Sequence, residues 1–233
     1  MPSRDLTLVL KARDEAKQSI SGFNKALDNM ATIAGGILSA QIFSRLSGEI
    51  IGFAQDSIKI ASDIEEAQNA VSISFGESAD DIRNWAQTTA ASYLLSERQA
   101  LQATASFGAF FTAMGVGQEA AKDMSIEVTQ LAGDLASFWN IDIQTALDKL
   151  RSGLAGEMQP LKALGVILSE ARVQQQAYAM GLAAIGAQLT DQQKLQARYA
   201  LILRDTSAAQ GDAIRTAGSF ANIQRRVNLE LEN

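Results

Sequence analysis

The spacing of proline and glycine between residues 150 and 166 constrains the fold of this chain more than any other feature. Pro160 is the only proline after Pro2, and three glycines surround it: Gly153, Gly156 and Gly165. Proline disfavours helix at the residue before it and suits the first turn of a helix, whereas glycine suits the left-handed position that ends one. The spacing therefore predicts a helix that ends near Gly156, a tight corner, and a short helix over residues 160–164.

Apolar residues in the same corner are expected to hold the short helix against a core. Leu161 and Leu164 supply these contacts, while Glu157 is the one acidic residue of the corner and is expected to be solvated. We treat the corner as a structural motif made of these residues: Leu150, Arg151, Gly153, Gly156, Glu157, Pro160, Leu161, Leu164 and Gly165.

Composition favours helices and narrows the chemistry that the chain can perform. Of the 233 residues, 47% are hydrophobic and alanine is abundant, so the chain can bury a sizeable core built from helices. The net charge of −6 and the isoelectric point of about 4.8 give no basic field for nucleic acid. The sequence lacks cysteine and histidine, which excludes disulfides, thiolate chemistry and a Ser-His-Asp triad. We predict no enzymatic activity, no cofactor and no catalytic, cofactor-binding or metal-binding residues.

Helix-start signals and apolar stripes recur along the chain. Ser78, Ser96 and Thr190 each begin a capping-box pattern, and Asp142 is a further expected N-cap. The helix after Ser78 is expected to run to about Ser92. Steps of three and four residues predict a buried stripe at Met124, Val128, Leu131, Leu135 and Phe138.

Aromatic residues near helix ends are also assigned to the core. Trp85 and Trp139 each lie on or end an apolar helix face, so both are expected to be core anchors. The last predicted helix carries Phe220, Ile223 and Val227.

A seven-residue apolar repeat is the clearest periodic signal. It runs from Phe43 to Val71 and predicts a long helix in a coiled coil or bundle. We expect copies of the chain to associate through this stripe, with a partner helix from the same chain as the open alternative. In residues 5–12, leucines alternate with other side chains, as in a short strand or extended arm. The predicted fold class is therefore all-α: an elongated multi-helix bundle with coiled-coil-like helices and a short N-terminal extended arm.

We expect four segments along the chain. Residues 1–35 hold the arm and the first helix, residues 36–76 the long heptad helix, and residues 77–215 a helical core. Residues 216–233 begin a further helical extension, which we expect to be truncated because no capping residue accompanies its end at Asn233.

Four stretches of the sequence resemble one protein family. The corner sequence ALDKLRSGLAGEMQPLKALGV resembles the core of phage tail tape measure proteins, which show a Leu-Arg-Ser-Gly-Leu-x-Gly-Glu-x-x-Pro-Leu-x-x-x-Gly-Val pattern. The other stretches similar to this family are SISFGESADDIRNWAQTTAASYLLSERQALQATASFGAFFTAMG, MSIEVTQLAGDLASFWNIDIQTALDKLRSGLAGE and LTDQQKLQARYALILRDTSAAQGDAIRTAGSFANIQRRV. Together they cover about residues 72–227 in family order.

The resemblance implies a structural role in a phage or prophage. Tape measure proteins are elongated helical rulers around which tail tube subunits polymerise; they set tail length and leave the tube when DNA is ejected. The implied location is the virion, inside the tail tube, and the host cytoplasm during assembly. The implied partners are tail tube proteins, tail-tip or baseplate proteins, tail assembly chaperones and further copies of the chain, with no specific nucleic acid and with the host membrane as a contact at ejection.

Chain length distinguishes this sequence from a complete ruler. At 1.5 Å per residue, a fully helical chain of this size would reach about 350 Å, and the repeated caps indicate several shorter helices instead. The chain is therefore expected to be a core near the start of a longer ruler. Two alternatives stay open: a cellular helical-bundle interaction module, or a membrane-perturbing segment acting at ejection, with residues 33–53 as the amphipathic candidate.

Overall fold

Helices joined by turns and loops make up residues 62–225, the part of the chain that the computed structural model describes. No strand occurs among these residues, which confirms the all-α class for them. The predicted arm, most of the predicted heptad helix, Val227 and the candidate membrane segment lie outside the described residues.

The order of helical elements follows the predicted starts and stops closely. Residues 62–75 are helical and lead into α3, and residues 220–225 form the last described helical turn. Between them lie η1 (Gly76–Ser78), α3 (Ala79–Thr88), η2 (Ala90–Tyr93), α4 (Glu97–Ala113), α5 (Gln118–Phe138), α6 (Ile143–Ala155), α7 (Gln159–Lys162), α8 (Glu170–Ala179), α9 (Asp191–Asp205) and α10 (Asp212–Arg215).

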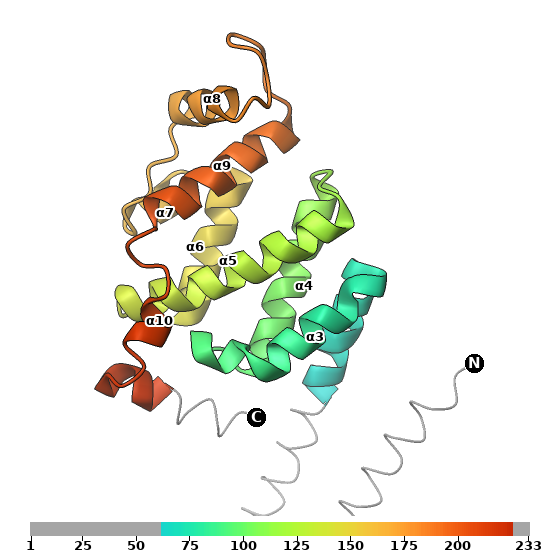
Figure 1. The fold of residues 1–233 in the computed structure, drawn as a ribbon, viewed down its shortest axis with the longest axis vertical. Coiled ribbons are helices and arrows are strands. Elements are labelled where there is room, and N and C mark those ends of the chain that lie inside the picture. The colour runs from blue at the N-terminus through green and yellow to red at the C-terminus, as the bar shows by residue number, and fades with distance from the viewer. Residues whose placement is uncertain (1–61, 226–233) are drawn as a thin grey trace, which may run out of the picture. The chain divides into compact units, whose positions relative to one another are not determined.

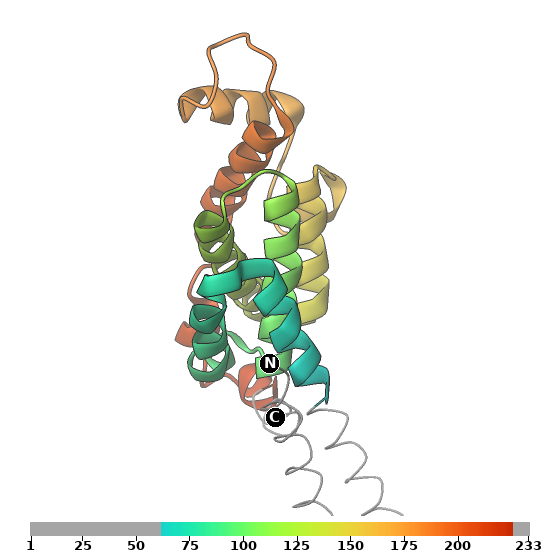
Figure 2. The same ribbon diagram turned by 90° about the vertical axis from the view of Figure 1, so that its right-hand side faces the viewer.

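Helix α5 lies at the centre of this arrangement. It packs against α4, α6, α10 and η2, and Figures 1 and 2 show α4 and α6 next to each other on one side of it. All side chains over residues 131–136 are buried, so α5 is covered on every side there, whereas a surface helix buries one stripe. At Gly133 a β-carbon would lie 2.0 Å from the backbone oxygen of Tyr93, so this glycine permits η2 to approach.

The described end of the apolar repeat packs inside the same unit. Ala67 and Val71, both on the predicted seam, are buried in the core. Phe75 is fully buried against α4 at Gly108, where a β-carbon would lie 1.9 Å from the Phe75 ring. This last part of the seam therefore finds its partner within the chain.

Most predicted caps are confirmed, and one is wrong. Ser96 and Thr190 both form complete capping boxes, and the Asp142 side chain accepts hydrogen bonds from the first-turn amides of α6. Ser78 does not cap α3. It is the last residue of the η1 turn, so its backbone lies outside the extended conformation of an N-cap, and its hydroxyl donates to Glu119 on α5. α3 also ends at Thr88, short of the predicted end, because the chain tightens into η2.

Several aromatic predictions need correction. Trp85 is half-buried against the core as predicted, but Trp139 is 44% exposed and Phe138 is 45% exposed. The two exposed rings lie where α5 ends and its neighbours no longer cover it, and they contact each other edge to face. Phe220 and Ile223 are also exposed.

Helices α8 and α9 pack against each other and are joined by an ion pair between Arg172 and Asp205. Both Asp205 carboxylate oxygens accept hydrogen bonds from the Arg172 guanidinium, at 2.8 and 3.0 Å. Burial raises the pKa of Asp205, but the hydrogen bonds and charges of Arg172 and Arg204 outweigh burial and hold this pKa below its ordinary value of 3.8.

Replacing Asp205 with Asn should destabilise the protein by about 1.5–3 kcal/mol at neutral pH, because hydrogen bonds to a charged group are lost. A carboxyl whose pKa is lowered by folding stabilises the folded state above its unfolded pKa. The difference between wild type and Asp205→Asn should therefore disappear as the pH falls below 3.8 and through the folded pKa. Urea unfolding across this range measures it, with exposed Glu77→Gln as the control; a pH-independent difference would contradict the assignment.

Replacing Gly133 with Ala should destabilise the protein by about 1–3 kcal/mol, because the added methyl group meets the Tyr93 backbone. Alanine is otherwise the better helix former by about 1 kcal/mol, so the sign of the change distinguishes steric conflict from helix propensity. Gly218→Ala is the control, since its β-carbon would meet nothing within 4 Å. Thermal unfolding of both variants measures the effect, and a stabilised Gly133→Ala protein would refute the close approach.

Candidate functional site

The predicted corner forms where α6 ends, and both glycine predictions there are confirmed. Gly156 has φ of 109°, and the amides of Gly156 and Glu157 donate to the carbonyl oxygens of Gly153 and Ser152. This pair of hydrogen bonds is a Schellman motif, which satisfies carbonyl groups at a helix end. Gly165, with φ of 81°, ends the turn after α7 in the same way.

Close packing of Leu161 against Gly153 holds the corner together. The Leu161 side chain is fully buried, and a β-carbon at Gly153 would lie 2.0 Å from its Cδ1 atom. Leu164 is 5% exposed, so the predicted core contacts of Leu161 and Leu164 are both confirmed, and Leu150 is fully buried as well. Pro160 lies in the first turn of α7, which restarts the chain in a new direction.

Charged residues around the corner contact backbone carbonyl groups. Arg198 on α9 donates to the carbonyl oxygen of Leu154, and Lys149 donates to that of Pro160. Glu157 is exposed, in agreement with its predicted solvated position. Arg151 differs from the rest of the motif, because its guanidinium donates to Ser106 Oγ on α4 at 2.7 Å.

A second polar cluster, not predicted from the sequence, joins α5 to the C-terminal part of the described chain. The Asp134 side chain is 4% exposed and accepts hydrogen bonds from the backbone amides of Gly211, at 2.7 Å, and Ala213, at 3.1 Å. Burial raises the pKa of Asp134, and these two backbone hydrogen bonds act against that rise. The carboxylate therefore serves as the acceptor for the start of α10.

Further hydrogen bonds extend this cluster toward residues 220–225. Ser137 Oγ donates to Asp212 Oδ2 at 2.6 Å and accepts from the Asn222 amide at 2.9 Å. Asn222 is 1% exposed and takes the inward position of this helical turn. The inward position is thus polar, and Phe220 and Ile223 lie on the outside.

The sequence does contain a signal for this cluster, namely an acidic residue within the apolar stripe of α5. Asp134 lies between Leu131 and Leu135, within a run of buried residues. A charged residue inside such a run is rarely buried unless it is paired or hydrogen-bonded. The sequence could therefore have indicated a polar contact at this position, although it could not have identified the partners.

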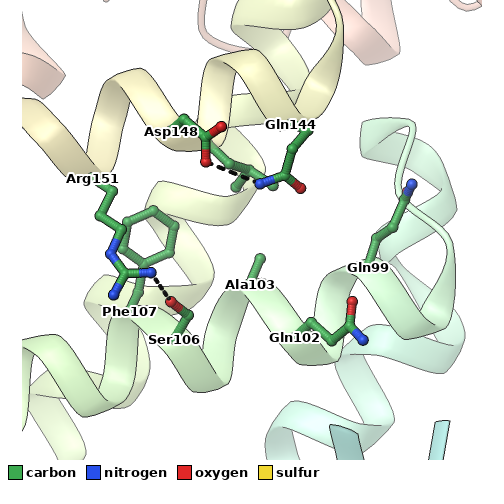
Figure 3. Close-up of a pocket in the computed structure, with 9 residues that line it drawn as sticks. Gln99, Gln102, Ala103, Ser106, Phe107, Gln144, Asp148 and Arg151 are labelled. Atoms are coloured by element: carbon green, nitrogen blue, oxygen red, sulfur yellow. Dashed lines mark hydrogen bonds between the residues drawn. The ribbon is translucent and has the colours of Figure 1, made fainter. Parts of the chain in front are cut away.

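A shallow groove of about 180 Å³ lies between α4 and α6 and is the best-defined candidate for a binding site (Figure 3). Its floor is apolar and nearly buried, made by Ala103, Phe107 and Leu147. Polar side chains form its rim, with α4 on one side and α6 on the other: Gln99, Gln102, Ser106, Gln144, Asp148 and Arg151. Hydrogen bonds from Arg151 to Ser106 and from Gln144 to Asp148 fix part of the rim.

Two other kinds of site are absent from the described residues: a cluster of metal ligands and a membrane-spanning helix. No group of three or more potential metal ligands comes together among residues 62–225. In the same range, no helix combines the length and the apolar character that crossing a membrane requires.

Replacing Leu161 with Ala should lower the free energy of unfolding by about 2–5 kcal/mol, because a fully buried leucine leaves a cavity over Gly153. Glu157→Gln, in the same corner, should change it by no more than about 0.5 kcal/mol. Urea unfolding compares the two. A large loss with Glu157→Gln and none with Leu161→Ala would contradict a structural role for the corner.

Replacing Asp134 with Ala should cost about 2–6 kcal/mol, since a buried amide and a partly buried one lose their acceptor and each loss costs about 1–3 kcal/mol. Asp123→Ala, at an exposed position of the same helix, should cost less than about 1 kcal/mol. Hydrogen exchange should show loss of protection at Gly211 and Ala213 in the first variant alone. Unchanged protection there would mean that Asp134 does not hold α10.

The chain was compared with known proteins at the levels of sequence family, curated sequence and solved structure. No protein family, curated protein or solved structure matches it. The resemblance to tape measure proteins consequently stays a prediction, which the contacts described above can support but do not test.

Proposed function

We propose that this chain is the helical core of a phage or prophage tail tape measure protein, with a structural and non-enzymatic role. One observation carries the proposal. Stretches that resemble separate parts of the family pattern, far apart in the sequence, contact one another and form one structural unit.

Three contacts illustrate this assembly. Asp134, from the stretch that leads into α6, accepts hydrogen bonds from the backbone of Gly211 and Ala213 in the last stretch. Arg151, in the corner, donates to Ser106 in the stretch that includes α4. The corner itself is closed by Leu161 over Gly153. Residues that hold a fold together in this way are consistent with a scaffold rather than with a reaction site.

In this proposal the described residues form a folded part of a longer ruler. Elongated, coiled-coil-like helices outside residues 62–225 would supply the length and would associate with further copies of the chain. Tail tube subunits, tail-tip proteins and assembly chaperones would bind during assembly in the host cytoplasm. The finished protein would lie inside the tail tube of the virion, and the host membrane would be a contact only at ejection.

The experiment uses particles made by the strain that carries this gene. Purified tails should contain the protein by mass spectrometry, and in-frame deletions in the helical region outside the described unit should shorten the tails in proportion to the residues removed. Leu161→Ala should block tail assembly, whereas Glu157→Gln should yield tails of normal length. Tails of unchanged length after the deletions, or intact tails without the protein, would refute the proposal.

A second candidate, a cellular helical-bundle interaction module, is supported by the exposed aromatic pair of Phe138 and Trp139. Exposed aromatic residues are common at protein interfaces. The same particle preparation separates the two candidates, because an interaction module of the cell would be absent from purified tails and present in cells without them.

A further inference from the structure

We propose that the loop between α8 and α9 is a processing site, at which an endopeptidase that accepts small aliphatic side chains cuts the chain without separating the two parts. The inference does not depend on the proposed function. Helix α8 ends at Ala179 and α9 begins at Asp191, and Figures 1 and 2 show the loop between them projecting away from the neighbouring helices.

Exposure distinguishes this loop from the other long connections. No side chain of residues 180–190 is buried, and Ile185, in the tip formed by residues 183–186, is 90% exposed. Buried side chains hold the two other connections of five or more residues within the described part of the chain: Leu164, Val166 and Leu168 before α8, and Thr206 and Ala209 before α10. The α8–α9 loop is therefore the long segment that a protease can approach most freely.

Few hydrogen bonds hold the tip in its shape. Its backbone makes one hydrogen bond within the described residues, in which the Ala187 amide donates to the Ala184 carbonyl oxygen at 3.0 Å. At the base of the loop, the Tyr178 hydroxyl donates to the Ala187 carbonyl oxygen at 2.9 Å. Gln193 Nε2 donates to the Leu182 carbonyl oxygen at 2.6 Å. Because an endopeptidase binds its substrate as an extended segment, a tip with one internal hydrogen bond can enter its cleft after a small local opening.

The side chains of the loop narrow the class of protease. Residues 173–190 include no charged residue, so an enzyme that cuts beside lysine, arginine, aspartate or glutamate finds no site in the loop. The tip instead carries alanine and isoleucine, and Ala187 follows it. A small apolar pocket, as in elastase, accepts such side chains. Exposed loop tips with small residues are also preferred positions for proteolytic nicking.

The step is hydrolysis of one peptide bond, and Ile185–Gly186 is the expected position. The bond between the Ile185 carbonyl carbon and the Gly186 nitrogen breaks. The water oxygen bonds to the carbonyl carbon with one hydrogen, and the other hydrogen goes to the nitrogen. The products ionise to a carboxylate and an ammonium group, and both lie where solvent can reach them, so neither charge has to be buried.

Contacts between the two parts hold them together after the cut. Helix α9 follows the cut in the chain and packs against α8 and α6, which precede it. Four side chains of α9 are buried: Leu195, Ala197, Leu201 and Ile202. The ion pair between Arg172 and Asp205 also joins the two parts. So do the hydrogen bonds that Asp134 accepts from the amides of Gly211 and Ala213.

The first experiment digests the full 233-residue chain with a small amount of pancreatic elastase, and mass spectrometry locates the cuts within residues 62–225. The first of these cuts should fall between residues 183 and 188. The two parts should elute together in size-exclusion chromatography, keep the helical circular dichroism spectrum, and separate only in denaturant. A first cut in another connection, no cut in this range, or parts that separate without denaturant would overturn the proposal.

Two arginine variants distinguish an accessible backbone from an exposed side chain. Ile185→Arg places a trypsin site at the tip, and Gln175→Arg places one at an exposed position within α8. Trypsin should cut the first variant after position 185 about ten-fold or more faster than the second after position 175, because the helix must open before it is cut. Equal rates, or faster cutting at position 175, would refute the assignment of the loop.

Discussion

The burial of one carboxylate on a helix covered from every side determines much of this architecture. Over residues 131–136, α5 needs a neighbour in each direction, and Asp134 needs hydrogen-bond donors rather than apolar contacts. The backbone amides at the start of α10 supply these donors. A polar requirement in the middle of the core thus fixes where a segment nearly 80 residues later in the chain must lie.

Glycine recurs where helical segments approach each other closely. Gly133 lets the η2 backbone approach, Gly108 accommodates the Phe75 ring, and Gly153 accommodates Leu161. At each position the neighbouring group occupies the space that a β-carbon would need. Glycine inside a helix costs about 1 kcal/mol relative to alanine, so these positions exchange local helix stability for close packing.

At the C-terminal end of the described residues, a polar side chain is buried and apolar side chains are exposed. Residues 220–225 turn a polar side chain, Asn222, inward and leave Phe220 outside, because the cluster around Asp134 and Ser137 requires polar partners. Near the same end, the Arg225 guanidinium donates to the side-chain oxygens of Asn222 and Asn140. These hydrogen bonds join residues 220–225 to the turn that follows α5.

The sequence by itself determined most of the positions where helices begin and end, because these signals act over about five residues. The start and the end of α3 are the exceptions. The caps at Ser96, Asp142 and Thr190 and the left-handed glycines at Gly156 and Gly165 could all be predicted from neighbours in the chain. The burial of Leu161 could be predicted from the same local pattern. The tertiary structure alone decided which face of each segment is covered, as Trp139 and Asn222 illustrate. It also decided the partners of Asp134 and the groove between α4 and α6, since both depend on residues that only folding brings together.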